Sequence, residues 1–309
     1  MADCGIVIVT YNSQNEIGRC LDAAMASGAD VVIVDNASED GTLAEIARTG
    51  ATGRGARVIA NPANRGFAAA VNQGFATLDT PYVLLLNPDA VLRTGIEALR
   101  DACRLPGVAA AGGRLVDSAG NPQTGFMIRR LPTPAALSLE VLLLNRVFPG
   151  NWINRRYRGL DLDLSGPLEV EQPAGAFLMV SRAVWEELGG FDEGFYPVWF
   201  EDVDFCRRAI GRGYHIYYCP QAVAEHAGGH SVGRLGLEMR RFYWYRSLLK
   251  YSARHFSPTG FRAVSLAVVT GSILRGVAES VIGRSLKPMA AYGGVARLAS
   301  RCFLLGWKG

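Results

Sequence analysis

Carboxylates that end apolar runs are the first residues in this sequence that could do chemistry. Asp35 ends the run that begins at Val31, and Asp89 follows the run 82–87 with Pro88 before it. Proline cannot continue the hydrogen-bond ladder of a strand, so we expect the strand to stop there and to present Asp89 at its rim. Hard ions such as Mg²⁺ and Mn²⁺ bind through one or two carboxylates and substrate phosphates, so Asp89 is suited to hold such an ion against a diphosphate. An aspartate that only caps the next turn is the alternative.

The segment after Asp35 predicts a connection from a strand to a helix. Ser38 and Asp40 are good helix caps and Gly41 permits a tight turn, so a structural role accounts for all three. It does not account for Asp35. A carboxylate at the carboxyl end of a strand in an α/β sheet commonly accepts hydrogen bonds from a nucleotide base or ribose, and we assign Asp35 that role.

An asparagine-rich turn, residues 61–67, leads into a predicted helix that carries Asn72. Such a turn can simply cap the helix. A helix start with free N–H groups beside the cation Arg65 would equally suit the oxygens of a diphosphate. Both interpretations stay open for this segment alone.

Three carboxylates, Glu201, Asp202 and Asp204, stand at the start of a predicted helix, after the aromatic pair Trp199 and Phe200. Acids favour helix N-termini, which accounts for one of them. Carboxylates this close raise one another's pKa, which favours a general base among them. The aromatic pair offers a surface on which a sugar could stack.

Two histidines, His226 and His230, frame a segment that contains Gly228 and Gly229. Their spacing would suit a metal pair on a helix, but the double glycine predicts a loop, so we predict no zinc site here. One of the two histidines could still join Asp89 on a catalytic metal.

Unbroken apolar runs alternate with helical segments in the first third of the chain. Runs of this kind predict a largely parallel sheet that is covered on both faces. The strands are expected at 5–10, 31–35, 57–61 and 82–87, and the helices between them at 15–27, 42–48, 66–76 and 94–105. This is the pattern of a doubly wound α/β fold, in which ligands bind outside the carboxyl ends of the strands.

The rest of the chain is less regular. Residues 120–173 show no regular spacing of hydrophobic residues and are rich in proline, which is typical of a lid or binding loop. One apolar helical patch is expected within them, at 135–144. From 237 onward the chain is expected to be mostly helical. Between these parts we expect a strand at 172–180, a helix at 182–188, extended chain at 195–200, a helix at 201–212 and extended chain at 215–219.

Composition and charge bound the class of protein. With 309 residues, 49% of them hydrophobic and 19% charged, the chain is neither disordered nor a polytopic membrane protein, and we expect one large core with a smaller appendage. Residues 240–309 carry twelve Lys and Arg against one acid, a net charge of +11, whereas residues 1–239 carry −7. A basic tail indicates a negative partner, either anionic lipid or nucleic acid, unless it is only a solvated face.

One apolar stretch in the tail, residues 263–282, resembles a membrane span, but Arg275 and Glu279 interrupt it. A span of about 20 apolar residues is expected to be cleaner. We therefore expect amphipathic helices that lie on a membrane face. The six cysteines include no CxxC pair and the first residues do not form a signal sequence, which predicts a cytosolic protein with reduced thiols.

Together these motifs resemble the family 2 glycosyltransferases, the large inverting GT-A group, and most closely its rhamnosyltransferase-like members. The resemblance runs from about Gly5 to Gly233. Each motif alone is a weak indication of the family, but the motifs in this order are highly specific. It rests on the motifs Val9-Thr-Tyr-Asn12, Val34-Asp-Asn-Ala-Ser-Glu-Asp-Gly-Thr42, Asn64-Arg-Gly-Phe67, Val71-Asn-Gln-Gly74, Leu86-Asn-Pro-Asp89, Gly175-Ala-Phe-Leu-Met179, Gly189-Gly-Phe-Asp-Glu193, Phe200-Glu-Asp-Val-Asp204 and His226.

The resemblance implies a role for each matching residue. Asp35 would read a pyrimidine base, Asp202 would be the catalytic base with Glu201 beside it, and Asp89 matches the last residue of the family's DxD metal motif. Asn87 stands where that motif has its first Asp, so one carboxylate fewer serves the ion. The nucleotide-sugar site would comprise Thr10, Tyr11, Asn12, Asp35, Asn36, Asn64, Arg65, Asn72, Asn87 and Asp89; the acceptor site Trp199, Glu201 and Gly175; and the metal site Asp89 and His226.

The resemblance also implies an architecture and an activity. We expect a GT-A catalytic domain over 1–236, with a nucleotide-sugar half at 1–118 and an acceptor half at 119–236, and a basic helical extension at 237–309. The expected reaction is inverting transfer of a sugar, rhamnose from dTDP-rhamnose, to a glycan or lipid-linked acceptor in cell-surface polysaccharide synthesis, with Mg²⁺ or Mn²⁺. The protein would be cytoplasmic and peripheral on the inner face of the cell membrane, with an anionic membrane surface and not nucleic acid as its partner. A homodimer through the C-terminal helices stays open.

Other functions remain as alternatives. A transferase of the same fold could use a UDP-hexose or UDP-galactofuranose, and a non-catalytic protein could bind the nucleotide sugar without turnover. A dinucleotide-dependent oxidoreductase is disfavoured because the glycine-rich segment 50–55 precedes a strand instead of following one. A glycosidase would use paired carboxylates but needs neither a nucleotide-binding sheet edge nor a metal.

Overall fold

The computed structural model describes residues 3–227 and 237–306, and the chain folds into two compact units. The units divide the chain differently from the expected boundary at 236, because the segments 131–161 and 198–200 join the C-terminal helices. The α/β unit consists of Met1–Arg130, Leu162–Pro197 and Glu201–Arg234, and the helical unit of Leu131–Asp161, Val198–Phe200 and Leu235–Gly309.

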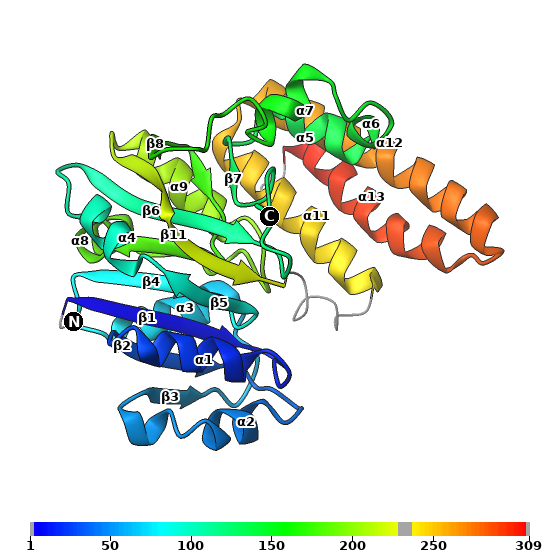
Figure 1. Ribbon diagram of the computed structural model, residues 1–309. Helices are drawn as coiled ribbons and strands as arrows, with labels where there is room; N and C mark the ends of the chain where they lie inside the picture. The colour runs from blue at the N-terminus through cyan, green and yellow to red at the C-terminus, as the bar shows by residue number, and fades with distance from the viewer. Residues whose placement is uncertain (1–2, 228–236, 307–309) are drawn as a thin grey trace. The chain divides into compact units, whose positions relative to one another are not determined.

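A mixed sheet forms the centre of the α/β unit, in the strand order β3-β2-β1-β4-β10-β6-β11-β5 (Figure 1). The first four strands in this order are parallel, as expected for the nucleotide-binding half. The strands of the main sheet are β1 (Cys4–Thr10), β2 (Asp30–Asp35), β3 (Arg57–Ala60), β4 (Tyr82–Leu86), β5 (Ala90–Thr94), β6 (Val108–Val116), β8 (Leu168–Glu169), β10 (Phe177–Ser181) and β11 (His215–His226).

The other half of the sheet is mixed. β10 lies antiparallel between β4 and β6, and β11 pairs parallel with β6 but antiparallel with β5 and β8. A separate small sheet joins β7 (Ile128–Arg129) to β9 (Gln172–Pro173). The predicted parallel pattern therefore holds for the nucleotide-binding half, and the reversed strand β10 connects it to the second half.

Burial explains why the apolar runs are unbroken. Every residue of β1 is buried, and β2 is buried from Val31 to Asp35. α1 buries Ile17, Leu21 and Ala24, which recur every three to four residues along one side of a helix. The helices of this unit are α1 (Ile17–Ala26), α2 (Thr42–Arg48), η1 (Thr52–Arg54), α3 (Phe67–Ala76), α4 (Ile96–Cys103), α8 (Arg182–Leu188) and α9 (Glu201–Gly211).

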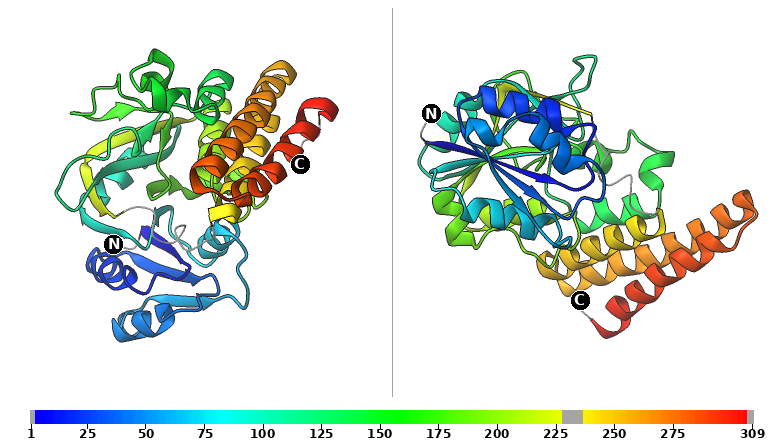
Figure 2. Two further views of the ribbon diagram at one scale, coloured as in Figure 1. Left: turned by 90° about the vertical axis from the view of Figure 1, so that its right-hand side faces the viewer. Right: turned by 90° about the horizontal axis from the view of Figure 1, so that it is seen from below.

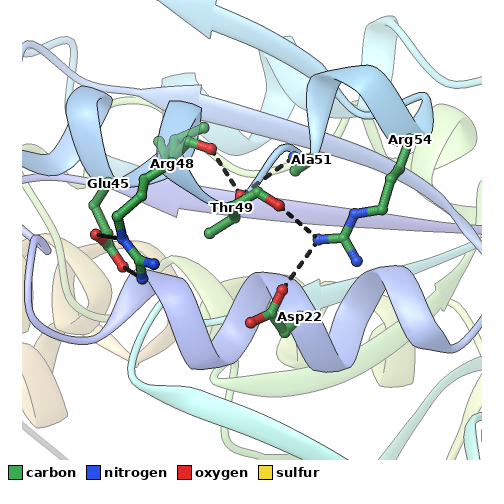
Figure 3. Close-up of polar contacts among 7 residues, drawn as sticks. Asp22, Glu45, Arg48, Thr49, Ala51 and Arg54 are labelled. Atoms are coloured by element: carbon green, nitrogen blue, oxygen red, sulfur yellow. Dashed lines mark hydrogen bonds and ion pairs between the residues drawn. The ribbon is translucent and has the colours of Figure 1, made fainter.

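Exposed ion pairs secure the segment that leads into β3, as Figure 3 shows. Arg54 donates to a carboxylate oxygen of Asp22 at 3.0 Å and to the carbonyl of Thr49 at 3.3 Å, which joins η1 to α1. Within α2, Arg48 and Glu45 form a bidentate pair at 2.7 and 2.6 Å. Exposed pairs of this kind contribute only about 0–1 kcal/mol each. They precede the amino end of β3, whereas ligands of this sheet type bind at the carboxyl ends.

The helical unit consists largely of three long helices, α11, α12 and α13, which pack side by side (Figure 2). This confirms the expected helical extension. The segment 120–173, which lost its sequence period, supplies three shorter helices to the same unit. The bounds are α5 (Pro134–Val141), α6 (Leu144–Val147), α7 (Trp152–Tyr157), α11 (Leu237–His255), α12 (Pro258–Gly283) and α13 (Lys287–Leu305).

The prediction of extended chain at 195–200 is wrong. The segment consists of turns and bends, with a cis peptide bond between Tyr196 and Pro197 and positive φ values of 82° at Trp199 and 73° at Phe200. Aromatic residues favour strands in general, but here this local preference is overridden by the turn that leads into α9.

Candidate nucleotide-sugar and catalytic site

Asp35 is fixed at the carboxyl end of β2 by hydroxyl groups. Thr10, its neighbour at the end of β1, donates from Oγ1 to Asp35 Oδ1 at 2.8 Å. Ser38 donates from its hydroxyl to Oδ1 at 2.5 Å and from its backbone N–H to Oδ2 at 3.0 Å. A carboxylate accepts about four hydrogen bonds. These three leave acceptor capacity for a nucleotide base or ribose, on a side chain that is only 1% exposed.

Asn12 braces the loop that contains Ser38. It adopts a positive φ of 52°, and its backbone N–H donates to the Ser38 hydroxyl at 2.8 Å. Its side-chain oxygen accepts from the N–H groups of Glu39 at 2.7 Å and Asp40 at 3.3 Å. Asn12 therefore shapes the rim of the site, and its half-buried neighbour Tyr11 lies on the same rim.

Asn36 connects the ends of β2 and β3. Its amide nitrogen donates to Asn64 Oδ1 at 2.9 Å and to the Gly66 carbonyl at 3.2 Å. Its oxygen accepts from the Arg65 N–H at 3.0 Å and from Asn61 Nδ2 at 3.3 Å. Both amide hydrogens of Asn36 are used in these contacts, so its part in the site is to hold the loop from which the exposed Arg65 side chain extends.

The start of α3, which the sequence suggested as an anion site, has its first backbone N–H in use within the protein. The Phe67 N–H donates to the Pro197 carbonyl at 2.7 Å, so a protein oxygen already occupies it. Gly66 has a φ of 86°, and a Cβ there would approach the Tyr196 ring at 2.9 Å, so glycine is required for this close packing. The exposed Arg65 side chain is suited to meet a diphosphate, and this role stays a prediction.

Asn72, predicted to bind the donor, contacts the turn at 189–193. Its amide nitrogen donates to the Phe191 carbonyl and to Glu193 Oε1, each at 3.0 Å, and its oxygen accepts from the Phe191 N–H at 3.0 Å. These contacts use the amide completely to hold the 189–193 turn against α3. Asn72 therefore has a structural role, and its contact with the donor stays a prediction.

Asp89 and His226 lie side by side, as the metal prediction requires. β5 begins directly after Asp89, and its first residue Ala90 pairs with His226 at the end of β11. Asp89 is 9% exposed and His226 is 4% exposed, and His226 Nε2 lies 3.6 Å from Asp89 Oδ1. The second histidine, His230, lies outside the described residues.

Gln123 orients His226, a role that nothing in the sequence indicated. Its Nε2 donates to the His226 carbonyl at 2.7 Å, which leaves Oε1 facing His226 Nδ1 at 3.0 Å. Nδ1 therefore carries the proton in the neutral ring, and the lone pair of Nε2 faces Asp89. Phe126 stacks on the ring with centroids 5.3 Å apart and planes 5° apart. Both residues lie in the irregular segment, where no spacing marked them.

The pair fits a divalent ion. Two lone-pair atoms 3.6 Å apart are too distant for a direct hydrogen bond but suit ligands that each stand about 2.1 Å from a shared cation. Within residues 3–227 and 237–306 no group of three or more His, Cys, Asp or Glu side chains could hold a metal. Mg²⁺ is usually bound by one or two protein ligands together with substrate phosphate and water, and Asp89 and His226 could supply the protein ligands of such a site.

Asp202, the predicted base, lies at the start of α9. Its Oδ2 accepts from the Gly175 N–H at 2.9 Å and its Oδ1 from the Val203 N–H at 2.8 Å. A Cβ on Gly175 would approach the Asp202 side chain to 3.0 Å, so the glycine allows the close contact. Loss of surrounding water raises the pKa of Asp202 above its usual range, and the two N–H donors oppose that rise.

Glu201 beside it is in a different state. It is 4% exposed, and its Oε2 has no hydrogen-bond partner in the described part of the chain. Burial, and next the charge of Asp202, raise the pKa of Glu201 well above its usual range. The two neighbouring carboxyl groups therefore differ in their surroundings: Asp202 accepts two N–H hydrogen bonds that oppose the rise in its pKa, whereas Oε2 of Glu201 has no partner in the described part of the chain.

Consecutive residues connect the two halves of the site. Ala176 accepts from the Asn87 N–H at 3.0 Å, which secures the turn that presents Asp89. Gly175, one residue earlier, donates to Asp202. The segment before β10 therefore positions the candidate metal carboxylate and the candidate base together. Trp199, predicted to bind acceptor, belongs to the helical unit, and its role stays a prediction.

Asp204, the third carboxylate, is structural. It is fully buried and its Oδ2 accepts from Arg208 Nε at 2.7 Å. Arg208 also donates to the carbonyls of Leu188 and Gly190, each at 2.7 Å, which fixes α9 to the end of α8.

Replacing Asp204 by asparagine is expected to lower the free energy of unfolding by about 3 kcal/mol, because a partly buried guanidinium loses its counter-ion. Urea unfolding measures this. The matched control is Glu186→Gln, which removes the exposed partner of Arg182 and is expected to cost under about 0.5 kcal/mol. If the two substitutions lowered the free energy of unfolding equally, Asp204 would contribute no more to stability than an exposed carboxylate.

Comparison with known proteins shows the family of this chain. The sequence profile of glycosyl transferase family 2 matches residues 5–184, and the chain belongs to that family. It is a glycosyltransferase. Its sequence is similar to the N-acetylglucosaminyl-diphospho-decaprenol L-rhamnosyltransferase of Mycobacterium tuberculosis, with 28% identity over 284 residues, covering 81% of this chain and 88% of the relative. It is also similar to the low-salt glycan biosynthesis hexosyltransferase Agl10 of Haloferax volcanii, with 25% identity over 72% of this chain and 67% of the relative.

Solved structures support the fold. The mannosyltransferase PcManGT of Pyrobaculum calidifontis, in complex with GDP-Man and Mn²⁺, aligns with a TM-score of 0.52 at 16% identity over 98% of this chain and 87% of its own. GalNAc-T7 with UDP, GalNAc and Mn²⁺ aligns with a TM-score of 0.54 at 12% identity over 82% of this chain and 51% of its own. Both are glycosyltransferases of the GT-A fold.

Proposed function

We propose that this glycosyltransferase transfers rhamnose from dTDP-rhamnose to a lipid-linked glycan acceptor. The observation that carries the site is the connection through Gly175 and Ala176, which holds the base Asp202 and the turn of Asp89 in one arrangement. The rhamnosyltransferase of M. tuberculosis, whose name describes a decaprenol-linked acceptor, supports the choice of sugar and acceptor. Such an acceptor would bring the protein to the cytoplasmic face of a membrane.

The donor would bind along the carboxyl ends of β1, β2 and β4. Asp35 would accept hydrogen bonds from the pyrimidine base or ribose, and the exposed guanidinium of Arg65 would meet the diphosphate. A divalent ion, Mg²⁺ or Mn²⁺, on Asp89 and His226 would neutralise the charge that develops on the departing diphosphate.

The transfer would proceed as a single in-line displacement. Asp202, ionised, would take the proton from an acceptor hydroxyl while that oxygen attacks the anomeric carbon, and the configuration would invert. Glu201, which lies beside Asp202 and whose Oε2 has no partner in the described part of the chain, would form a hydrogen bond with the acceptor and so orient it. The raised pKa of Asp202 makes it a better proton acceptor than an ordinary exposed aspartate.

A panel of nucleotide sugars tests the donor. The purified protein is offered dTDP-rhamnose, dTDP-glucose, UDP-galactose and UDP-galactofuranose, with Mn²⁺ or with EDTA, and release of the nucleotide diphosphate is measured. We expect release from dTDP-rhamnose with Mn²⁺ to exceed every other combination by at least about tenfold, because a site built for one sugar discriminates by hydrogen bonds to its hydroxyls. The similarity to a hexosyltransferase makes a UDP-hexose the main rival, and preference for it would reject the rhamnosyl assignment.

A further inference from the structure

The helix α12 carries large apolar residues on its outward side as well as on its buried side, where Phe261, Val264 and Val268 lie. Its outward side carries large aliphatic residues at helical spacing, and each of them is 46% or more exposed. They are Leu266, Ile273, Leu274, Val277, Val281 and Ile282. A soluble helix places such residues in the core and polar residues outside, so this face, hereafter the α12 apolar face, requires an apolar partner.

Two charged residues of α12, Arg275 and Glu279, contact the other helices of the unit. Arg275 donates to the carbonyls of Glu140 and Val141 at 3.2 and 3.0 Å. Glu279, which is partly exposed, accepts from Arg241 of α11 at 2.8 Å and from Tyr292 of α13 at 3.0 Å. The two charges that interrupt the apolar stretch in the sequence therefore leave the α12 apolar face uncharged.

Charge at the two ends of this face identifies its occupant. Arg262 precedes the face, Arg284 and Lys287 follow it, and all three are exposed. The one acid between residues 240 and 309 is Glu279, which is already paired. Cations around an apolar face complement anionic lipid headgroups, whereas two copies of the face would bring cations together.

Charged residues on the neighbouring helices limit how deeply α12 can enter a membrane. In the described residues α12 is the one helix that is long and apolar enough to cross a membrane by length and composition, and 28% of its most apolar window is buried in the protein. α11 and α13, which pack against it, carry exposed arginines at 246, 297 and 301. A spanning α12 would draw these charges into hydrocarbon, so an orientation in the plane of the interface is favoured.

We propose that the α12 apolar face inserts into the interface of an anionic lipid bilayer, with α12 lying in the membrane plane. The cations at its two ends would contact lipid phosphates, and their aliphatic stems would extend along the acyl boundary. This rests on the proposed function only in that a lipid-linked acceptor would lie in the same plane.

Vesicle sedimentation of the full-length protein tests the inference. The double variant Ile273→Glu with Val281→Glu is compared with Val147→Glu with Phe148→Glu, two residues of the same helical unit that are 65% and 64% exposed but lie outside α12. On phosphatidylglycerol–phosphatidylcholine vesicles we expect the first variant to bind at least about tenfold more weakly than wild type and the control to bind normally. Normal vesicle binding by the α12 double variant would overturn the proposal. The proposal would also be overturned if light scattering showed that wild type is a dimer, that the α12 double variant is not, and that both bind vesicles equally.

Two further measurements separate this inference from folding and from catalysis. The variant Ile273→Trp is expected to gain fluorescence quenching by brominated lipid relative to wild type, and Val147→Trp is not; no gain at position 273 would also overturn the proposal.

Nucleotide diphosphate release from soluble dTDP-rhamnose should be the same in wild type and the α12 double variant. A wild-type protein that binds vesicles but fails to use the sugar would reject the proposed donor and leave the lipid contact standing.

Discussion

Replacing Asp202 by asparagine is expected to lower kcat by about a thousandfold while the nucleotide diphosphate still binds with nearly unchanged affinity. The amide keeps the shape of the side chain but cannot take a proton, and general base catalysis contributes about 10² to 10⁴ in rate. Nucleotide diphosphate release under saturating donor and acceptor measures the first quantity, and calorimetric titration of dTDP measures the second.

The wild-type pH profile is part of this prediction. Asp202 must be ionised to act, and its surroundings raise its pKa, so activity is expected to fall with decreasing pH through a value above that of an exposed aspartate. The variant Asp204→Asn removes a carboxylate from the same turn of the helix but leaves the proposed base in place. Its folded fraction should lose activity at low pH in the same way as wild type. Near-normal kcat in Asp202→Asn would make the base assignment wrong.

Replacing Asp89 by asparagine is expected to remove the effect of Mn²⁺ on dTDP binding. The carboxylate is the charged protein ligand of the candidate pair, and without it the ion has His226 and the diphosphate alone. Calorimetric titration of dTDP with and without Mn²⁺ should show an increase in affinity with the metal for wild type and no increase for Asp89→Asn.

A graded variant makes the Asp89 experiment sharper. Gln123→Leu keeps both candidate ligands but removes the hydrogen bond to Nδ1 that fixes the ring of His226. Loss of such an orienting partner typically costs about 10- to 100-fold in metal affinity. Metal-dependent binding that is equal in wild type, Asp89→Asn and Gln123→Leu would show that the ion does not bind at this pair.

The sequence predicted most of the nucleotide-binding half because local pattern and tertiary structure agree there. β1 and β2 are buried throughout or nearly so, so their apolar runs are continuous, and the runs end at Thr10 and Asp35, where the functional side chains follow. The second half was predicted less well. β10 runs antiparallel between β4 and β6, and the direction of a strand leaves no mark in its own residues.

The candidate site, too, was predicted only in part from the sequence. Asp89, Asp202 and His226 were predicted from their residue types and from the family motifs that they match, and the structure brings Asp89 and His226 side by side. Gln123 was missed because its contact with His226 joins residues 103 positions apart, in a segment without period. Asn72 was assigned to the donor on its residue type, but its amide is used in holding the Phe191 turn.

The anomeric configuration of the product tests the central claim most directly. If Asp202 activates an acceptor hydroxyl for one in-line displacement, proton NMR during turnover of dTDP-rhamnose should show the transferred sugar with the configuration opposite to that of the donor. A product with the donor's configuration would contradict single displacement by an activated acceptor at this site.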